Sequence, residues 1–430
     1  MANDILITTE SLKHILPVLE DNIIEKAKYE LPKTVEPLDN DIPMVYIAGT
    51  IPTSKDYVAG ELEYVSKTTR FKAYTLIKLQ GTSSLAHPKK NFTINLYKDE
   101  DHNVELNKEF KNWGAHNNFV LKADYIDILH ARNVVCAKLW SKVVASRSDY
   151  DTLPEELRNS PNNGAIDGFP IKVYIDGVYN GLYNWTIPKC TWMFGMDEVN
   201  ENHVVLCAEM NDNGDEALAN NPCNFFGMWD GSEDYWSVEV GDLSDEVIGS
   251  LNNVIGNVSD YQIGLLKDCL DIQSAIDYFV FQDVILGIDG LAKNMLLATY
   301  DMTKWYLSAY DLDSTFDLHW QGETMGAVYA DMPDHAYMNR YSRLVDLILN
   351  NCRDEYVARY IELRNSVLSE ASIISAFEDY VNIYGDDLYI QDTVVYPDIP
   401  SVTNNNLSAL RTFVKNRLAY LDNKYMEVSA

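Results

Sequence analysis

Basic residues are scarce in this 430-residue chain: 34 Lys and Arg stand against 65 Asp and Glu, which gives a formal charge of −31. A duplex nucleic-acid binder needs a basic surface against the phosphates, so this charge argues against that class. It favours basic protein partners and metal ions, although a surface serving only solubility would look the same. The hydrophobic content of 47%, with 28 Tyr and 8 Trp, indicates a globular chain.

Several familiar signals are also missing. No run approaches the ~20 apolar residues of a membrane span, and residues 1–4 begin neither a basic patch nor the apolar core of a signal peptide. We therefore expect cytoplasmic synthesis, with later incorporation into a phage particle as an open alternative. No Gly-x-Ser-x-Gly elbow and no His-Glu-x-x-His are present, so a serine hydrolase and a zinc protease gain no support. The cysteines form no Cys-x-x-Cys pair, which favours free buried thiols over a zinc site.

The order of predicted elements indicates an α+β chain. Residues 8–29 have helical apolar spacing and are followed by an extended linker, so 1–40 is either a docking segment or a helix packed on the domain. From 41 to 190 short strands prevail, 195–260 has the character of an acidic, loop-rich insertion, and 261–430 is mostly helical. The expected strands are 45–51, 73–79, 91–96, 119–123, 171–175 and 178–183, and the expected helices are 128–144, 261–286, 340–365, 371–383 and 405–425.

The most informative stretch begins at Asp289. Asn294 follows five residues later, then two short strands, 295–300 and 305–310, and then Asp311. Protein kinases use this order: a catalytic Asp, an Asn five residues on, a hairpin, and a metal-binding Asp. Asp289 would accept the proton of the acceptor hydroxyl, and Asn294 and Asp311 would hold Mg²⁺.

Each of these residues also has an ordinary explanation. Asp289-Gly290 is a common turn dipeptide, and Asn294 can simply cap a turn. Asp311 and Asp313 point the same way if the strand continues to Leu312, and two such carboxylates need a cation unless they lie in solvent. The joint order of the residues favours the metal-binding interpretation.

Phosphate binding has weaker signals. The loop 81–84 between two predicted strands can offer backbone N–H groups to phosphate oxygens, although a plain β-turn fits equally. Lys89 and Lys90 follow at a strand start, and because side chains alternate along a strand, only one should face the site. Asp127 can cap the predicted helix 128–144, or a carboxylate there can pair with the phosphate-binding lysine.

Taken together, these segments resemble the CotH family, the spore-coat kinase family of atypical protein kinases. The matching stretches occur in the family's order across residues 45–425. They are 79–84, 88–92, 121–127 with 131–133, 173–183, Asp289 with Asn294, and 310–313.

The resemblance implies a two-lobed, protein-kinase-like fold, with a mixed or antiparallel sheet in the N-terminal lobe and a mostly helical C-terminal lobe. It implies ATP with Mg²⁺ or Mn²⁺, and transfer of the γ-phosphate to Ser or Thr of a basic, Ser-rich protein. Asp289 would be the catalytic residue, and Asn294, Asp311 and Asp313 the metal ligands. The implied nucleotide-binding residues are Gly81, Ser83, Ser84, Lys89, Lys90 and Arg132.

The chain departs from the family pattern in places. Residues 78–81 read Lys-Leu-Gln-Gly where the family often has Arg-x-Arg-Gly, and Ile187-Pro188 stands where a Glu often follows residues 181–183. Such variants are similar to CotH-like domains of tailed bacteriophages. Two alternatives therefore stay open: a phage virion or adhesion protein with a catalytically silent scaffold, docked through residues 8–29, and a kinase-like enzyme that transfers AMP.

Overall fold

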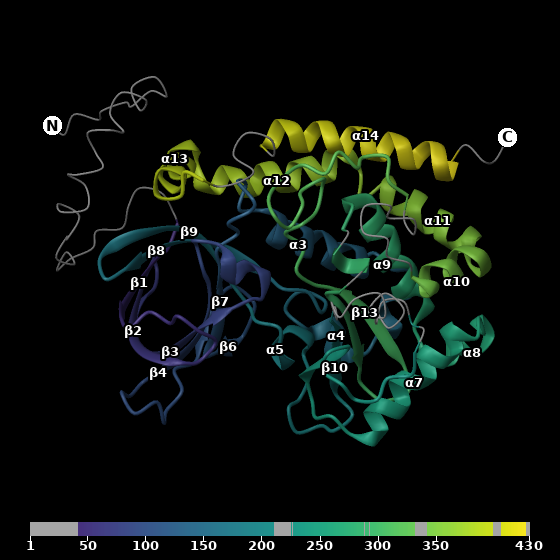
Figure 1. Ribbon diagram of the computed structural model, residues 1–430, viewed down its shortest axis with the longest axis horizontal. Coiled ribbons are helices and arrows are strands. Elements are labelled where there is room, and N and C mark those ends of the chain that lie inside the picture. Colours follow the sequence, from purple (N-terminus) through teal and green to yellow (C-terminus); the bar gives the residue numbers. More distant parts are fainter. Residues whose placement is uncertain are drawn as a thin grey trace.

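A closed barrel, a second sheet and a helical C-terminal part make up the chain, which is of the expected α+β class (Figure 1). The computed structural model describes residues 42–209, 225, 227–287, 289–291, 293–331, 342–398 and 406–426. The predicted N-terminal docking segment, 1–40, lies outside the described residues. Among the described residues, no helix is long and apolar enough to cross a membrane.

The barrel joins seven strands in the order β1-β2-β3-β4-β7-β9-β8. Neighbours run antiparallel except β1 and β8, which pair in parallel with Met44 beside Lys172. The predicted strands are present, but closure of the sheet was not foreseen and is not what a two-lobed kinase-like fold implies. The strands are β1 (Met44–Gly49), β2 (Val58–Val65), β3 (Arg70–Gln80), β4 (Asn91–Tyr97), β7 (Asn118–Lys122), β8 (Gly168–Ile175) and β9 (Val178–Thr186).

Aromatic side chains fill the barrel. Phe110 lies at the centre of the group, with ring centroids 5.1 Å from Tyr64, 5.2 Å from Phe119 and 5.7 Å from Trp185. All four side chains are buried. Such rings bury large apolar areas, so this interior is a packed core and not a ligand cavity. Two short strands, β5 (Lys108–Glu109) and β6 (Ala115–His116), flank Phe110 as a separate two-stranded sheet.

The β8–β9 hairpin confirms a turn prediction. Asp176 and Gly177 both adopt left-handed backbone angles, with φ of 47° and 81°. Two successive residues with positive φ define the type I′ turn, which suits the twist of a hairpin, and Asp-Gly is a preferred sequence for it.

The second sheet takes two of its strands from residues 195–260, which the sequence analysis described as an acidic, loop-rich insertion. Its strand order is β11-β10-β12-β13, so this stretch supplies half of the sheet. Val205 of β10 pairs with Ala298 of β12, which makes the segment part of the core. The strands are β10 (Val204–Ala208), β11 (Trp236–Val240), β12 (Met295–Thr299) and β13 (Trp305–Ala309).

Helices complete the molecule. Helix α9 packs against β13 and is buried on nearly all sides, since every residue from Ser274 to Ile285 is buried. Asp271 caps it by accepting a hydrogen bond from Ser274 N at 2.7 Å. The helices are α3 (Arg132–Ala145), α4 (Glu155–Asn159), α5 (Thr191–Phe194), α7 (Asp245–Ser259), α8 (Ile263–Cys269), α9 (Ile272–Ile285), α10 (Arg343–Asn351), α11 (Arg353–Arg364), α12 (Glu370–Tyr384), α13 (Asp386–Val395) and α14 (Leu407–Met426).

The C-terminal helices return to the barrel. Helix α13, which the sequence did not predict, packs against β9 at the end of α12 (Figure 1). On α12, the hydroxyl of Tyr380 donates to Asn184 Oδ1 at 2.7 Å, and that of Tyr384 donates to the His130 carbonyl at 2.7 Å. The last part of the chain therefore ties the barrel to the helical half.

Candidate active site

A cleft of about 470 Å³ opens between the barrel and the second sheet. The barrel side contributes Gly81, Ser84 and Lys89 to its wall, together with the end of β7. The opposite side contributes the four acidic and amide residues that the sequence singled out: Asp289, Asn294, Asp311 and Asp313. The structure thus brings together residues that lie up to 232 positions apart in the chain.

The loop after α9 places Asp289 in the cleft. Leu286 ends the helix in the left-handed region with φ of 51°, and a short 3-10 turn, η4 (Asp289–Leu291), follows. Asp289 is 8% exposed, and its Oδ2 lies 3.9 Å from Lys293 Nζ. A nearby cation favours the ionised form of a carboxylate, which is the form that a proton acceptor requires.

Asn294 is held at the start of β12. Its backbone N–H donates to the Ala208 carbonyl of β10 at 2.9 Å, and its φ is 62°. The side chain is 8% exposed, and its Nδ2 has no hydrogen-bond partner within the described residues. Asn adopts the left-handed backbone region readily, so the feature that needs an explanation is the buried Nδ2 group without a partner among the described residues.

Asp311 and Asp313 reach the cleft for a reason other than the predicted one. Strand β13 stops at Ala309 and Asp311 has a φ of 54°, so the strand does not continue to Leu312. The chain turns instead, and Leu312 N donates to Asn133 Oδ1 of α3 at 3.2 Å. This turn lets both carboxylates line the same wall.

The pKa values of the two carboxyl groups are shifted in opposite directions. Burial raises the pKa of Asp311, but Lys122 and Lys293 outweigh burial and hold that pKa below its usual range. The pKa of Asp313 is raised well above its usual range by burial and by the charges of Asp311 and Asp289. The carboxyl groups of this wall repel one another when all of them are ionised. A divalent cation bound between them would reduce that repulsion.

Lys122 is a site residue to which the sequence analysis gave no role. It stands at the end of β7 with its Nζ 3.3 Å from Asp311 Oδ1, and it crosses the cleft to make this contact. Burial lowers the pKa of Lys122, but the charges of Asp311 and Tyr310 outweigh burial. The net pKa is above the usual value for lysine, so the ammonium stays charged. The available signal was its position, since a lysine ending an apolar strand two residues before Asp124 is unusual in an acidic chain.

Lys89 lines the cleft but is engaged in an ion pair. Its Nζ lies 3.0 Å from Asp392 Oδ1 of α13 and also donates to the Leu182 carbonyl. His130 Nε2 approaches the other oxygen of Asp392 at 2.9 Å, and the side chains of all three residues are at most 1% exposed. Lys89 therefore anchors α13 to the cleft wall.

Lys90 and Arg132, two expected nucleotide-binding residues, do not belong to the cleft wall. Lys90 Nζ donates to the carbonyls of Leu85 and His87, within its own loop. Arg132 is fully buried, where it contacts the Asp127 carboxylate and donates to the Thr315 carbonyl at 3.1 Å. Neither side chain has a place in the proposed site.

Asp127 and Asp124 have separate roles. Asp127 accepts hydrogen bonds from the backbone of Ala131 and Arg132 at 2.9 and 2.8 Å, so it satisfies the first N–H groups of α3, as a cap would. Asp124 lines the cleft, is fixed by Asn184 Nδ2 at 2.7 Å, and has a pKa raised by burial.

The predicted phosphate loop is a short 3-10 turn, η1 (Ser83–Ala86). Gly81 enters it with φ of 104°, and a Cβ there would come within 2.0 Å of Ser84 Oγ, so only glycine fits. Asn91 fastens the loop: its Nδ2 donates to Ser84 Oγ at 3.3 Å and its Oδ1 accepts from Ala123 N at 2.6 Å. Ser83 lies in the same turn.

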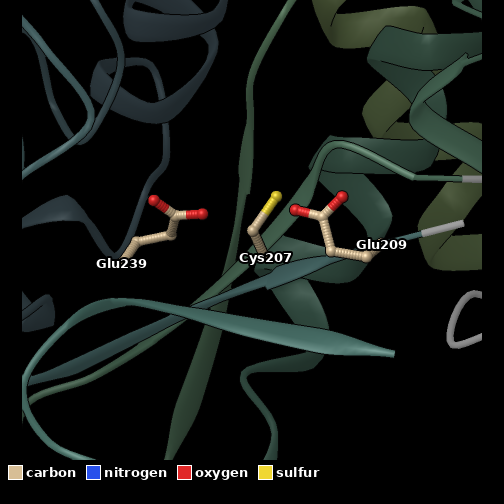
Figure 2. Close-up of side chains that lie close together, drawn as sticks. All are labelled: Cys207, Glu209 and Glu239. Atoms are coloured by element: carbon tan, nitrogen blue, oxygen red, sulfur yellow. The ribbon is translucent and has the colours of Figure 1, made fainter. Parts of the chain in front are cut away.

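A second cluster of possible metal ligands borders the cleft. Ligand atoms of Cys207, Glu209 and Glu239 lie within 4.8 Å of one another, and Figure 2 shows both carboxylates turned toward the sulfur. However, Lys189 forms an ion pair with Glu239, and Ser237 Oγ lies 2.8 Å from an oxygen of each carboxylate. The cluster thus has its own cation and hydrogen bonds and needs no metal.

Charges balance within the cleft although the whole chain is strongly acidic. Six lysines line it: Lys55, Lys78, Lys89, Lys122, Lys189 and Lys293. This concentration of cations fits an anionic ligand.

The family model of the CotH kinase protein matches residues 77–421, which cover most of the chain and every cleft residue named above except Lys55. The chain belongs to the CotH kinase family. A search of curated proteins gives no match. Family membership points to a kinase-like protein, and the cleft described above lies within the matched residues.

Proposed function

We propose that this CotH-family chain is a protein kinase that transfers the γ-phosphate of ATP to a Ser or Thr hydroxyl of a protein. The observation that carries the proposal is the joint placement of Asp289, Asn294, Asp311 and Asp313 in one cleft with Lys122 and Lys293. In this proposal the barrel and the second half correspond to the two lobes of a kinase, with the cleft between them.

The oxygen donors suit Mg²⁺ or Mn²⁺, since both ions prefer carboxylate and amide oxygens. Asn294, Asp311 and Asp313 would hold the metal, which supplies neutralisation of phosphate charge when bound. The place of Asn294 in the same cleft wall and the mutual repulsion of the carboxylates support this donor set. The metal ligands come from both sides of the β12–β13 hairpin, which fixes their spacing.

The remaining residues have chemical roles in the proposal. Asp289 accepts the proton of the acceptor hydroxyl and orients its oxygen toward the γ-phosphate. Lys122 and Lys293 supply positive charge for the phosphate oxygens. The backbone N–H groups of the 81–86 loop donate hydrogen bonds to the same oxygens from the barrel side. The excess of acidic residues elsewhere favours a basic, Ser-rich protein as the substrate.

The test is label transfer from γ-labelled ATP to a basic, Ser-rich protein in the presence of Mg²⁺ or Mn²⁺. We expect Asp289→Ala to reduce kcat by ~100-fold or more, because general-base catalysis contributes at least that factor. Asp379→Ala, at an exposed position of α12, is the matched control and should retain wild-type rates.

Three outcomes would refute the proposal. Equal label transfer by Asp289→Ala and the wild type would remove the assigned role. Mass spectrometry that finds an adenylyl group in place of a phosphate on the substrate would show AMP transfer, and absence of nucleotide binding in calorimetry would indicate a silent scaffold.

A further inference from the structure

Gln282 is a buried polar residue that the site described above does not use. It lies on α9, one turn before the Asp289 loop, and is 1% exposed. Neither Oε1 nor Nε2 of its amide has a hydrogen-bond partner in the described parts of the chain. Most buried side-chain amides are hydrogen-bonded, so an exception needs a physical explanation.

Two glycines make room for this amide. A Cβ at Gly287 would come within 1.8 Å of Gln282 Oε1, and a Cβ at Gly290 within 2.5 Å of Gln282 Nε2. These glycines flank Asp289, so the amide lies directly against the backbone of the loop that carries the proposed catalytic carboxylate. Any side chain at either position would push the amide away.

The same face of α9 holds the loop at a second point. The hydroxyl of Tyr278, one helical turn before Gln282, donates to the Gly290 carbonyl at 2.7 Å. Residues four apart on a helix share a face, so Tyr278 and Gln282 together form a floor beneath the loop. Tyr278 makes its bond in this structure, whereas the amide of Gln282 makes none with the described residues.

An apolar residue would fill this space at lower cost, because a buried amide without partners is destabilising. We propose that Gln282 is a positioning residue, whose amide hydrogen-bonds to the backbone of the Asp289 loop when ligand draws the loop into its reactive arrangement. The inference rests on the proposed kinase activity. It adds a residue, Gln282, that would fix the position of the Asp289 carboxylate in the cleft.

The test compares Gln282→Leu with Gln273→Leu, a control on the same helix but far from the loop. We expect Gln282→Leu to lower kcat by ~10-fold or more with the KM for ATP within about twofold, since small misplacement of a catalytic group is costly. The melting temperature should stay the same or rise, because an unmatched amide has been removed. A merely structural residue would instead lower the melting temperature.

Gly290→Ala displaces the amide by a different route and should show the same loss of kcat, so the proposal stays testable if Gln282→Leu fails to fold. Hydrogen exchange of residues 287–294 with Mn²⁺ and a non-hydrolysable ATP analogue gives a readout without turnover. We expect slower exchange in the wild type than in Gln282→Leu.

The outcomes separate the two claims. No label transfer by the wild type refutes the kinase activity. Wild-type transfer with an unchanged kcat in Gln282→Leu overturns the role of Gln282. Equal exchange of the loop in wild type and variant overturns that role as well, whatever the turnover.

Discussion

The same substitution at two lysines on the barrel side of the cleft should affect two different properties of the protein. Lys89 is wholly buried in an ion pair with Asp392, whereas Lys122 faces Asp311 across the cleft with its side chain 10% exposed. Replacing each by methionine keeps most of the length and the apolar body of the side chain and removes the ammonium group with its charge and hydrogen-bond donors. Lys89→Met should therefore affect folding, and Lys122→Met should affect nucleotide binding.

The expected size for Lys89→Met follows from burial. Breaking a buried pair by removing one partner costs about 3–5 kcal/mol, because the remaining charge is left without compensation. In Lys89→Met, His130 Nε2 still lies 2.9 Å from Asp392 and remains a polar partner of that carboxylate. We therefore expect the free energy of unfolding to fall by an amount near the lower end of this range, about 3 kcal/mol. Lys122→Met should cost less than about 1 kcal/mol, since the partly solvated Asp311 keeps Lys293 as a second cation.

Urea unfolding of the two variants and the wild type measures these free energies, and calorimetry with ATP and Mn²⁺ measures the affinities. We expect Lys122→Met to weaken ATP binding by ~10-fold or more and Lys89→Met to change it by less than about threefold. The double variant Lys89→Met with Asp392→Asn should recover most of the lost stability. A Lys89→Met protein of wild-type stability that no longer binds ATP would refute this division of roles.

Three further predictions concern charged groups. Burial raises the pKa of Asp392, but Lys89 and His130 outweigh burial and hold that pKa well below its usual range. The ionised Asp392 carboxylate therefore makes its full contribution to the stability of the folded state above pH ~4. The difference in unfolding free energy between the wild type and Asp392→Asn should therefore shrink as pH falls further; a constant difference would contradict this. Asp311→Asn should weaken Mn²⁺ binding in calorimetry by ~10-fold or more, while Asp379→Asn leaves it unchanged. Arg417→Met should lower the unfolding free energy in urea by about 3–5 kcal/mol, because Asp283 loses its partner at 2.7 Å, whereas Arg364→Met at a more exposed pair should cost less than about 1 kcal/mol.

Local patterns predicted the elements that form the acidic wall. The spacing from Asp289 to Asn294 and the two apolar runs after it gave a hairpin, and β12 and β13 occupy those runs. Asp-Gly at 176–177 gave the turn between β8 and β9 because few sequences tolerate two positive φ angles. In both cases the information lies within a few neighbouring residues.

Long-range pairing was not predictable in the same way. Closure of the barrel depends on β1 pairing with β8, more than 120 residues later, and no local pattern encodes that register. Residues 204–208 and 236–240 are short strands within an acidic stretch, so composition favoured loops, and only pairing with β12 makes them strands.

The roles of the lysines were hidden for a related reason. Alternation along a strand predicted that Lys89 and Lys90 should point in different directions. It did not predict that the inward-pointing Lys89 would form an ion pair with Asp392. Helix α13 was missed because its sequence, from Asp386 to Val395, lies among turn-forming residues. The importance of Lys122 likewise appears only when β7 is placed opposite Asp311.

The return of α12 and α13 to the barrel has a mechanical consequence. The chain passes from the barrel into α3 and α4 after β7, returns to the barrel for β8 and β9, and leaves it again after β9. The hydroxyls of Tyr380 and Tyr384, near the other end of the sequence, add further contacts between the two parts. Two bodies connected at several separate points resist hinge motion more than two bodies connected at one. In the proposed kinase, we therefore expect nucleotide to enter and leave the cleft with little change in the angle between the two parts.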